Sequence, residues 1–197
     1  LVVAIELDLS EAPSGGTAVS RPIAYAQLEE ALGVRIGDRV PIEDLRESVL
    51  RLRASKGMLL DPDDPNSRSA GSFFTNPIVG ENFARGLPAD APRWPTSPDE
   101  PAVAVPLGET PAPPPPASDY RVKLSAAWLI EKAGIGRGFS LPGSRAAVSS
   151  VHTLALVNAG GATAREVVEL ARYIQTRVFA EFGVRLQAEP VLVGVEL

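Results

Sequence analysis

The first nine residues alternate between apolar and polar side chains, with the apolar members at Leu1, Val3, Ile5, Leu7 and Leu9. Successive side chains of a strand point to opposite faces of a sheet, so this period of two predicts a half-buried strand over residues 1–9. A strand at the end of a chain leaves backbone donors and acceptors that need a neighbour. We therefore expect residues 1–9 to depend on sheet partners, which need not lie in this chain.

Two helices are predicted next. Residues 25–32 form a short helical segment that ends at Gly33, and Pro41 occupies a position that the first turn of a helix accepts. The helix after Pro41 carries one apolar stripe, at spacings of four and three residues: Leu45, Val49 and Leu52. It ends near Lys56-Gly57, because a cation followed by a glycine is typical of a helix C-terminus.

The second half of the chain alternates predicted strands with helices. The segment Thr163-Ala-Arg-Glu166 is a capping box, in which the two side chains satisfy the free amides that begin a helix ending at Gly183. Shorter patterns predict strands over 73–79, 146–148, 153–157, 184–186 and 191–193, and a helix over 124–133. This order of elements indicates an α+β fold in which helices cover a small mixed sheet.

Proline is concentrated in one segment, because 11 of the 19 prolines lie between positions 88 and 116. Each proline removes a backbone donor and fixes φ, so we expect no regular helix or strand there. The segment is predicted to be an extended, polyproline-like surface loop. It is either a tolerated insertion or a recognition segment for a proline-binding domain.

Composition and charge remove several classes of function. The 197 residues carry a net charge of −5, no cysteine and one histidine. Thiolate catalysis, disulfides and multi-histidine metal sites are therefore excluded, and we expect no metal. The acidic balance argues against a broad nucleic-acid surface, and no apolar run approaches the about 18 residues that would predict a membrane span. The absence of cysteine fits a reducing cytoplasm. The chain starts without methionine inside an apolar run, so we expect it to belong to something longer.

Several polar residues are candidates for chemistry, each with a plainer interpretation. Gly71 allows a tight turn that would expose Ser72 at the mouth of a strand, with Asn76 just before Pro77; a plain turn and strand would look the same. His152 could act only in a Ser-His-Asp arrangement whose other two members the fold would have to bring together, and it is expected to be a structural histidine. Two charged residues remain: Lys56 could contact a phosphate or only solvent, and Glu189 could be a buried acid or a surface residue.

Five segments, taken in order, resemble one family of flavoproteins. They are Arg53-Ala-Ser-Lys-Gly-Met58, Ser69-Ala-Gly-Ser-Phe-Phe-Thr-Asn-Pro77, Lys123-Leu-Ser-Ala-Ala-Trp-Leu-Ile-Glu-Lys-Ala-Gly134, His152-Thr-Leu-Ala-Leu-Val-Asn158 and Leu186-Gln-Ala-Glu-Pro-Val191. The family is UDP-N-acetylenolpyruvoylglucosamine reductase, also called UDP-N-acetylmuramate dehydrogenase. The resemblance covers nearly the whole chain and corresponds to the C-terminal part of the enzyme.

The resemblance also implies a division of the chain. Residues 1–57 would end the FAD-binding domain, whose N-terminal part is missing, and residues 58–187 would form the substrate-binding domain. Residues 188–197 would form a final strand that returns to the flavin side. Two departures from the family are insertions: a proline-rich one over 86–118, and residues 61–65, which lengthen the spacing from Lys56 to Ser72.

The resemblance implies a two-step redox reaction of peptidoglycan precursor synthesis. NADPH reduces bound FAD, and hydride then passes to C3 of the enolpyruvyl group of UDP-N-acetylglucosamine enolpyruvate. Ser72 matches the proton donor to C2, and Glu189 matches the glutamate that stabilises the enolic carboxylate. Tyr25, Lys56 and Asn76 match the contacts of the family to the diphosphate. The product is UDP-N-acetylmuramate.

Two other interpretations compete with a reductase. The chain could be a non-catalytic nucleotide-sugar-binding or interaction module, using the proline-rich loop to engage a partner. It could also be an unrelated structural α+β domain, which would make five ordered matches a coincidence. Under the first interpretation the isolated chain would still bind a UDP-sugar, so binding alone does not separate it from the enzyme. Without the flavin half we expect the isolated chain to catalyse nothing.

Overall fold

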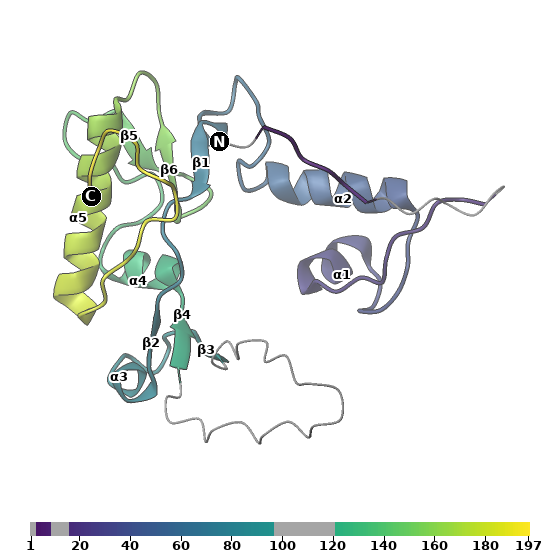
Figure 1. The fold of residues 1–197 in the computed structure, drawn as a ribbon, viewed down its shortest axis with the longest axis horizontal. Coiled ribbons are helices and arrows are strands. Elements are labelled where there is room, and N and C mark those ends of the chain that lie inside the picture. Colours follow the sequence, from purple (N-terminus) through teal and green to yellow (C-terminus); the bar gives the residue numbers. More distant parts are fainter. Residues whose placement is uncertain (1–2, 9–15, 97–120) are drawn as a thin grey trace, which may run out of the picture. The chain divides into compact units, whose positions relative to one another are not determined.

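The computed structural model describes residues 3–8, 16–96 and 121–197, and these form two compact units, Leu1–Leu59 and Leu60–Leu197 (Figure 1). Each unit is described by itself. No helix within the described ranges is long and apolar enough to cross a membrane. The assignment of the first 57 residues to a flavin-binding domain, and of the residues after them to a substrate-binding domain, stays a prediction.

The first unit contains the two predicted helices, α1 (Ala26–Leu32) and α2 (Ile42–Ala54). Gly33 ends α1 at φ 67°, in the left-handed region that glycine adopts without strain. The strand predicted over residues 1–9 is wrong for residues 3–8, which form no strand; residues 1, 2 and 9 lie outside the described residues. Val3 is 85 % exposed. A strand needs a hydrogen-bonded neighbour, and no described segment pairs with this one.

The larger sheet of the second unit has the order β1-β6-β5, all antiparallel. Its strands are β1 (Ser69–Ser72), β5 (Ala146–Val148) and β6 (Ala155–Asn158). Helix α5 (Ala164–Phe182) contacts β5 and β6 and lies along the side of the sheet (Figure 1). The predicted capping box at Thr163 and Glu166 is present and starts α5, and Gly183 ends it at φ 67°.

A second antiparallel sheet has the order β2-β4-β3. It consists of β2 (Ile78–Gly80), β3 (Arg93–Thr96) and β4 (Arg121–Leu124). Three short helices accompany this sheet along the chain. Helix η1 (Pro65–Ser67) precedes β2, α3 (Glu81–Arg85) connects β2 to β3, and α4 (Ala126–Lys132) follows β4. The α+β class is confirmed. The sheets differ from the expectation in detail, because two small antiparallel sheets take the place of one mixed sheet.

Several predicted boundaries are corrected by tertiary pairing. Residues 73–79 are not one strand, since β1 ends at Ser72 and β2 begins at Ile78. The helix predicted over 124–133 begins at Ala126, because Leu124 is still paired in β4 and Ser125 caps the helix. Residues 184–186 and 191–193 form no strand, and the C-terminal segment makes only an isolated bridge to the chain after β1.

The proline-rich segment is only partly described. Residues 93–96 form β3 and pair with β4, which corrects the expectation that no strand could form among these prolines. Pro95 is tolerated because β3 is the edge of its sheet, where a missing N–H leaves no neighbour unpaired. The rest of the predicted loop, from residue 97 to 118, lies outside the described residues.

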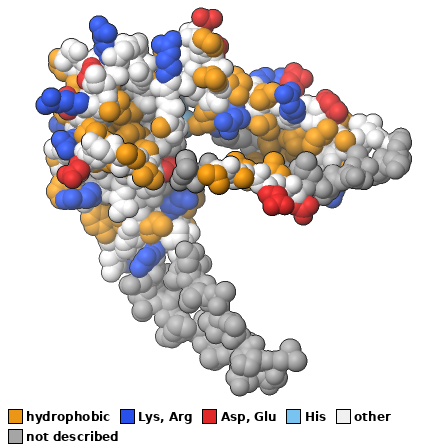
Figure 2. Space-filling view, turned by 45° about the horizontal axis from the view of Figure 1, so that its top comes forward, with side chains coloured by type: hydrophobic (Ala, Val, Ile, Leu, Met, Phe, Trp, Pro, Cys, Tyr) orange, Lys and Arg blue, Asp and Glu red, His pale blue; other side chains and the backbone are white. Residues whose placement is uncertain are grey.

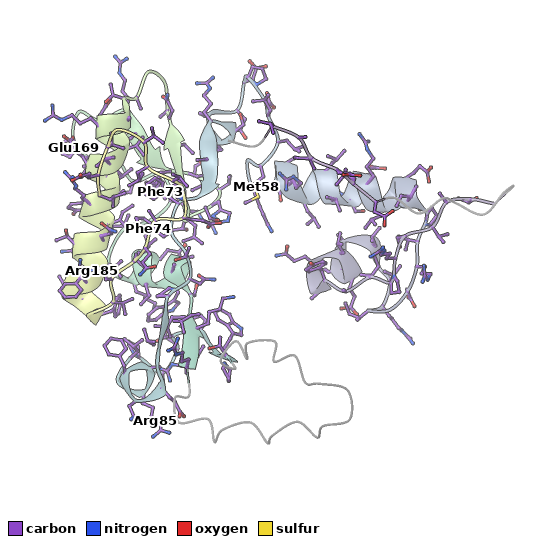
Figure 3. All side chains as sticks on the ribbon, in the orientation of Figure 1. Met58, Phe73, Phe74, Arg85, Glu169 and Arg185 are labelled. Carbon is purple, nitrogen blue, oxygen red and sulfur yellow. The ribbon has the colours of Figure 1, made fainter. Side chains whose placement is uncertain are left out.

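One hydrophobic core joins both sheets and α5. Its most deeply buried members include Phe74, Leu124, Leu129, Ile130, Ile135, Leu170, Ile174 and Leu186. Phe73 and Phe74 follow β1 directly, and their rings meet edge to face with centroids 5.1 Å apart (Figure 3). Two buried aromatic rings therefore fix the backbone that continues from Ser72.

Candidate functional site

A bulge in β1 sets the position of Ser72. Ser69 lies opposite Val157 and Ser72 opposite Ala155, so β1 uses one residue more than β6 over the same length. Gly71 lies within this irregularity at φ 83°, a conformation that side chains with a Cβ disfavour. The glycine turn expected before Ser72 is therefore present, and its form is a β-bulge.

The residues after Ser72 pair with the C-terminal segment. The Glu189 N–H donates to the Phe73 carbonyl (2.9 Å), and the Thr75 N–H donates to the Gln187 carbonyl (3.0 Å). In Figure 1 the yellow C-terminal trace runs beside the chain that follows β1. This pairing carries Glu189 from the far end of the sequence to the neighbourhood of Ser72.

Ser72 and Glu189 line one cleft of about 660 Å³, a volume typical of small-molecule sites. Ser72 is half-buried, and its hydroxyl makes no hydrogen bond within the described residues. Glu189 is exposed. The other lining residues are Phe74, Thr75, Asn76, Ile78, Thr96, Arg121, Lys123 and Leu154. The cleft therefore combines an unpaired hydroxyl and a carboxylate with cations and an apolar surface.

Asn76 has a structural contact as well as a place in the cleft. Its Oδ1 accepts a hydrogen bond from the Ala126 N–H (3.0 Å), one of the free amides at the start of α4. Ser125 caps the same helix, because its Oγ accepts from the Trp128 N–H (3.2 Å). The Nδ2 amide of Asn76 has no partner in the described part of the chain, so its two donors are available to a ligand.

Arg121 and Lys123 are site residues that the sequence argument missed. Strand β4 alternates exposed and buried positions, which leaves both cations on the exposed face while Val122 and Leu124 enter the core. Both cations line the cleft with Ser72 and Glu189. The sequence pattern that could have revealed them is the alternation Arg121-Val-Lys-Leu124, which is typical of a half-buried strand with its charged side chains on the exposed face.

Tyr25 and Lys56 lie in the first unit, where both line a smaller pocket of about 290 Å³. The Lys56 Nζ donates to Gln27 Oε1 (2.9 Å), and Tyr25 is 71 % exposed. Most of the remaining lining is apolar, from α1 and from the stripe of α2. The five expected site residues thus fall into two groups, Tyr25 with Lys56 and Ser72 with Asn76 and Glu189, which belong to different units.

His152 is held by its own loop. Its Nδ1 accepts a hydrogen bond from the Leu154 N–H (3.1 Å), which agrees with the expectation of a structural histidine. In the part of the chain that the structure describes, no group of three or more His, Asp or Glu side chains could hold a metal ion.

The carboxylates with shifted pKa values lie outside the cleft. The Arg145 and Thr163 backbone N–H groups donate to Glu166 and lower its pKa to about 2. A hydrogen bond from Lys132 lowers the pKa of Asp90. Glu166 and Asp90 therefore stabilise the fold, and neither lines the cleft.

On the face in Figure 2, Lys and Arg side chains are interspersed with acidic and apolar ones.

Comparison with known proteins identifies the family. A family profile described as UDP-N-acetylenolpyruvoylglucosamine reductase, C-terminal domain, matches residues 63–193. Curated relatives that carry the name UDP-N-acetylenolpyruvoylglucosamine reductase include those of Leifsonia xyli subsp. xyli, with 57 % identity over 100 % of this chain and 54 % of that protein, and Thermobifida fusca, with 49 % identity over 91 % and 47 %. A third, from Mycobacterium tuberculosis, is 43 % identical over 99 % of this chain and 48 % of its own length.

The chain spans about half the length of the curated relatives it matches. The profile covers well over half of the chain and includes β1, the C-terminal segment and the cleft between them. The chain belongs to the UDP-N-acetylenolpyruvoylglucosamine reductase family.

Proposed function

We propose that this chain is the substrate-binding part of an NADPH- and FAD-dependent reductase of peptidoglycan precursor synthesis in the cytoplasm. The substrate is UDP-N-acetylglucosamine enolpyruvate and the product is UDP-N-acetylmuramate. The observation that carries the proposal is that Ser72 and Glu189 line the same cleft, although they lie near opposite ends of the amino-acid sequence of the second unit. The names of the relatives supply the reaction class.

Ser72 is the proton donor in this proposal. When bound, FAD would supply the hydride for C3 of the enolpyruvyl group, which would leave C2 in need of a proton. An unpaired, half-buried hydroxyl can rotate toward that carbon. The bulge at Gly71 holds its backbone, so little reorganisation accompanies proton transfer.

Glu189 stabilises the carboxyl end of the same group by hydrogen bonding, which requires its carboxyl group to carry the donated hydrogen while the substrate is bound. The negative charge of the substrate is offset by Arg121 and Lys123, which line the same cleft. The apolar part of the cleft, from Phe74, Ile78 and Leu154, suits the face of a sugar or of an enolpyruvyl group. The residues present therefore fit the proposed substrate.

Three residues, each described within its own unit, are proposed to contact the diphosphate. Asn76 would donate from Nδ2, because its Oδ1 is already occupied at the start of α4. Lys56 would supply a point charge and Tyr25 a phenolic hydroxyl. No described residue is assigned to the flavin, and we expect the isolated chain to bind a UDP-sugar weakly and to catalyse nothing.

The test uses the full-length enzyme with its flavin half, whose two half-reactions are followed separately by flavin absorbance. In Ser72→Ala, reduction by NADPH should be unchanged, while reoxidation by the enolpyruvyl substrate should slow by about 10²–10⁴-fold, as expected for loss of a general acid. Ser140→Ala is the matched control, because Ser140 is exposed and outside the cleft. Unchanged reoxidation in Ser72→Ala would refute the role of Ser72. A full-length protein that binds the UDP-sugar but no flavin would favour the binding-module alternative.

A further inference from the structure

Asn66 connects the turn before β1 to the loop between β5 and β6. Its Oδ1 accepts three hydrogen bonds from that loop: from Ser149 Oγ (2.8 Å), from the Ser150 N–H (2.9 Å) and from Ser150 Oγ (3.2 Å). Asn66 lies in η1, just after the 61–65 insertion, so a segment with no expected role contacts a loop more than 80 positions away in the sequence.

Asp64 fixes the direction in which the Asn66 amide points. Asp64 Oδ1 accepts from both the backbone N–H (2.8 Å) and the Nδ2 (2.9 Å) of Asn66. With its nitrogen committed to Asp64, the amide turns its oxygen toward Ser149 and Ser150. An aspartate at position 66 could still accept from the loop, but its side chain could not donate to Asp64 and would face a like charge.

Ser149 is the buried centre of this contact. Its side chain is fully buried, and its Oγ donates to Asn66 while accepting from the Val151 and His152 N–H groups, both at 3.2 Å. A buried hydroxyl that loses its acceptor carries a desolvation penalty. The conformation of residues 149–152 therefore depends on the oxygen that Asn66 supplies.

The same loop supports the backbone around Ser72. The Phe73 N–H donates to the Leu154 carbonyl (2.7 Å), and Ser72 lies opposite Ala155 in the sheet. Both backbone polar groups of Ala155 bond to the loop: its N–H donates to the His152 carbonyl (3.0 Å), and its carbonyl accepts from the Ser149 N–H (2.8 Å). Leu154 also lines the cleft. A displacement of residues 149–152 would pass through these bonds to Ser72.

We propose that Asn66 is a positioning residue for Ser72, acting through the 149–154 loop and held in its own orientation by Asp64. This inference rests on the proposed function, because Ser72 matters to catalysis only if it donates the proton. Asn66 does not line the cleft and is not proposed to contact the substrate.

The first test needs no substrate. Amide hydrogen exchange is measured in the full-length protein for Asn66→Asp, Asn66→Ala and the control Ser67→Ala, which removes a hydrogen bond of the same turn (Ser67 Oγ to the Asp61 carbonyl, 2.6 Å) without reaching the loop. We expect about tenfold faster exchange at Phe73 and His152 in both Asn66 variants and no change in the control. Unchanged exchange at Phe73 in both Asn66 variants overturns the proposal.

The second test separates the half-reactions in the same variants. Both Asn66 variants should slow flavin reoxidation by the enolpyruvyl substrate by about tenfold through misplacement of Ser72, with reduction by NADPH unchanged. The exchanged pair Asp64→Asn with Asn66→Asp restores one donor and one acceptor and should recover most of the rate. If the control Ser67→Ala slows reoxidation as much as Asn66→Asp does, or if Asn66→Asp leaves reoxidation at the normal rate, Asn66 does not position Ser72. Failure of the proposed function itself would appear separately, as normal reoxidation in Ser72→Ala.

Discussion

Replacing Gly71 with alanine disturbs the placement of Ser72 without touching its hydroxyl. Gly71 adopts φ 83° in the bulge of β1, a region where a Cβ approaches the backbone too closely. Apart from Gly71 itself and its two chain neighbours, a Cβ built at this position meets no atom within 4 Å, so no clash with a more distant residue adds to the effect. The perturbation is therefore one of backbone conformation alone.

The magnitude follows from two opposing terms. A residue with a side chain in the left-handed region loses about 1–2 kcal/mol. Removing a glycine also restricts the unfolded chain, which restores about 0.4–1 kcal/mol. We therefore expect the free energy of unfolding to fall by about 1 kcal/mol if the bulge persists. If the bulge is lost instead, β1 slips by one residue and Ser72 turns to the opposite face of the sheet.

Gly143→Ala provides the control, because Gly143 has φ 76°, equally open space around it and no place in the cleft. Urea denaturation should show similar losses of stability for both variants. Only Gly71→Ala should slow flavin reoxidation in the full-length enzyme, by about tenfold or more. The reasoning is refuted if Gly71→Ala is as stable as the parent protein, or if both variants slow reoxidation equally.

Three further predictions address the core, the acid side of the pH range and the cleft. Phe74→Ala should lower the free energy of unfolding by about 3–5 kcal/mol, and the exposed Phe179→Ala by less than about 1 kcal/mol, in denaturant titrations. The folded state lowers the pKa of Glu166 from 4.5 to about 2, so its stabilising effect is complete above pH 4.5 and is lost as the pH falls toward 2; Glu166→Gln should flatten the dependence of stability on pH in that window. Asn76→Asp keeps an oxygen for the Ala126 N–H and should change stability by less than about 0.5 kcal/mol. By calorimetry it should weaken binding of the UDP-sugar by the full-length enzyme about tenfold, since a donor becomes a negative oxygen.

The helices whose limits are set by local signals were predictable. The Thr163–Glu166 capping box and the left-handed glycines at 33 and 183 act within one turn of the chain, and the structure keeps all of them. The helix after Pro41 likewise begins where expected. Signals that are complete within a few residues survive into the fold because no distant partner is needed to satisfy them.

Strand limits depend on partners and were predicted less well. The Phe73-to-Val79 pattern is apolar enough for a strand, yet the chain leaves one sheet at Ser72 and enters another at Ile78. The concentration of prolines excluded a strand, yet β3 forms because its position at the edge of the sheet tolerates Pro95. Neither outcome is visible without knowing which strand lies alongside.

The residues around Glu189 show which part of the site a sequence pattern can specify. Val184 and Leu186 are buried and Ala188 is partly buried, while Arg185, Gln187 and Glu189 are exposed, so the segment alternates as a strand does. The alternation alone turns Glu189 away from the core. It does not reveal which segment lies opposite, because that depends on the pairing with Phe73 and Thr75 and on the Gln175 Nε2 that donates to the Leu186 carbonyl (2.9 Å). A pattern of period two thus determines on which face of the segment the Glu189 carboxylate lies. Its distance from Ser72 is set by the hydrogen bonds to Phe73 and Thr75, which are more than 100 positions away and are brought close only by the folded chain.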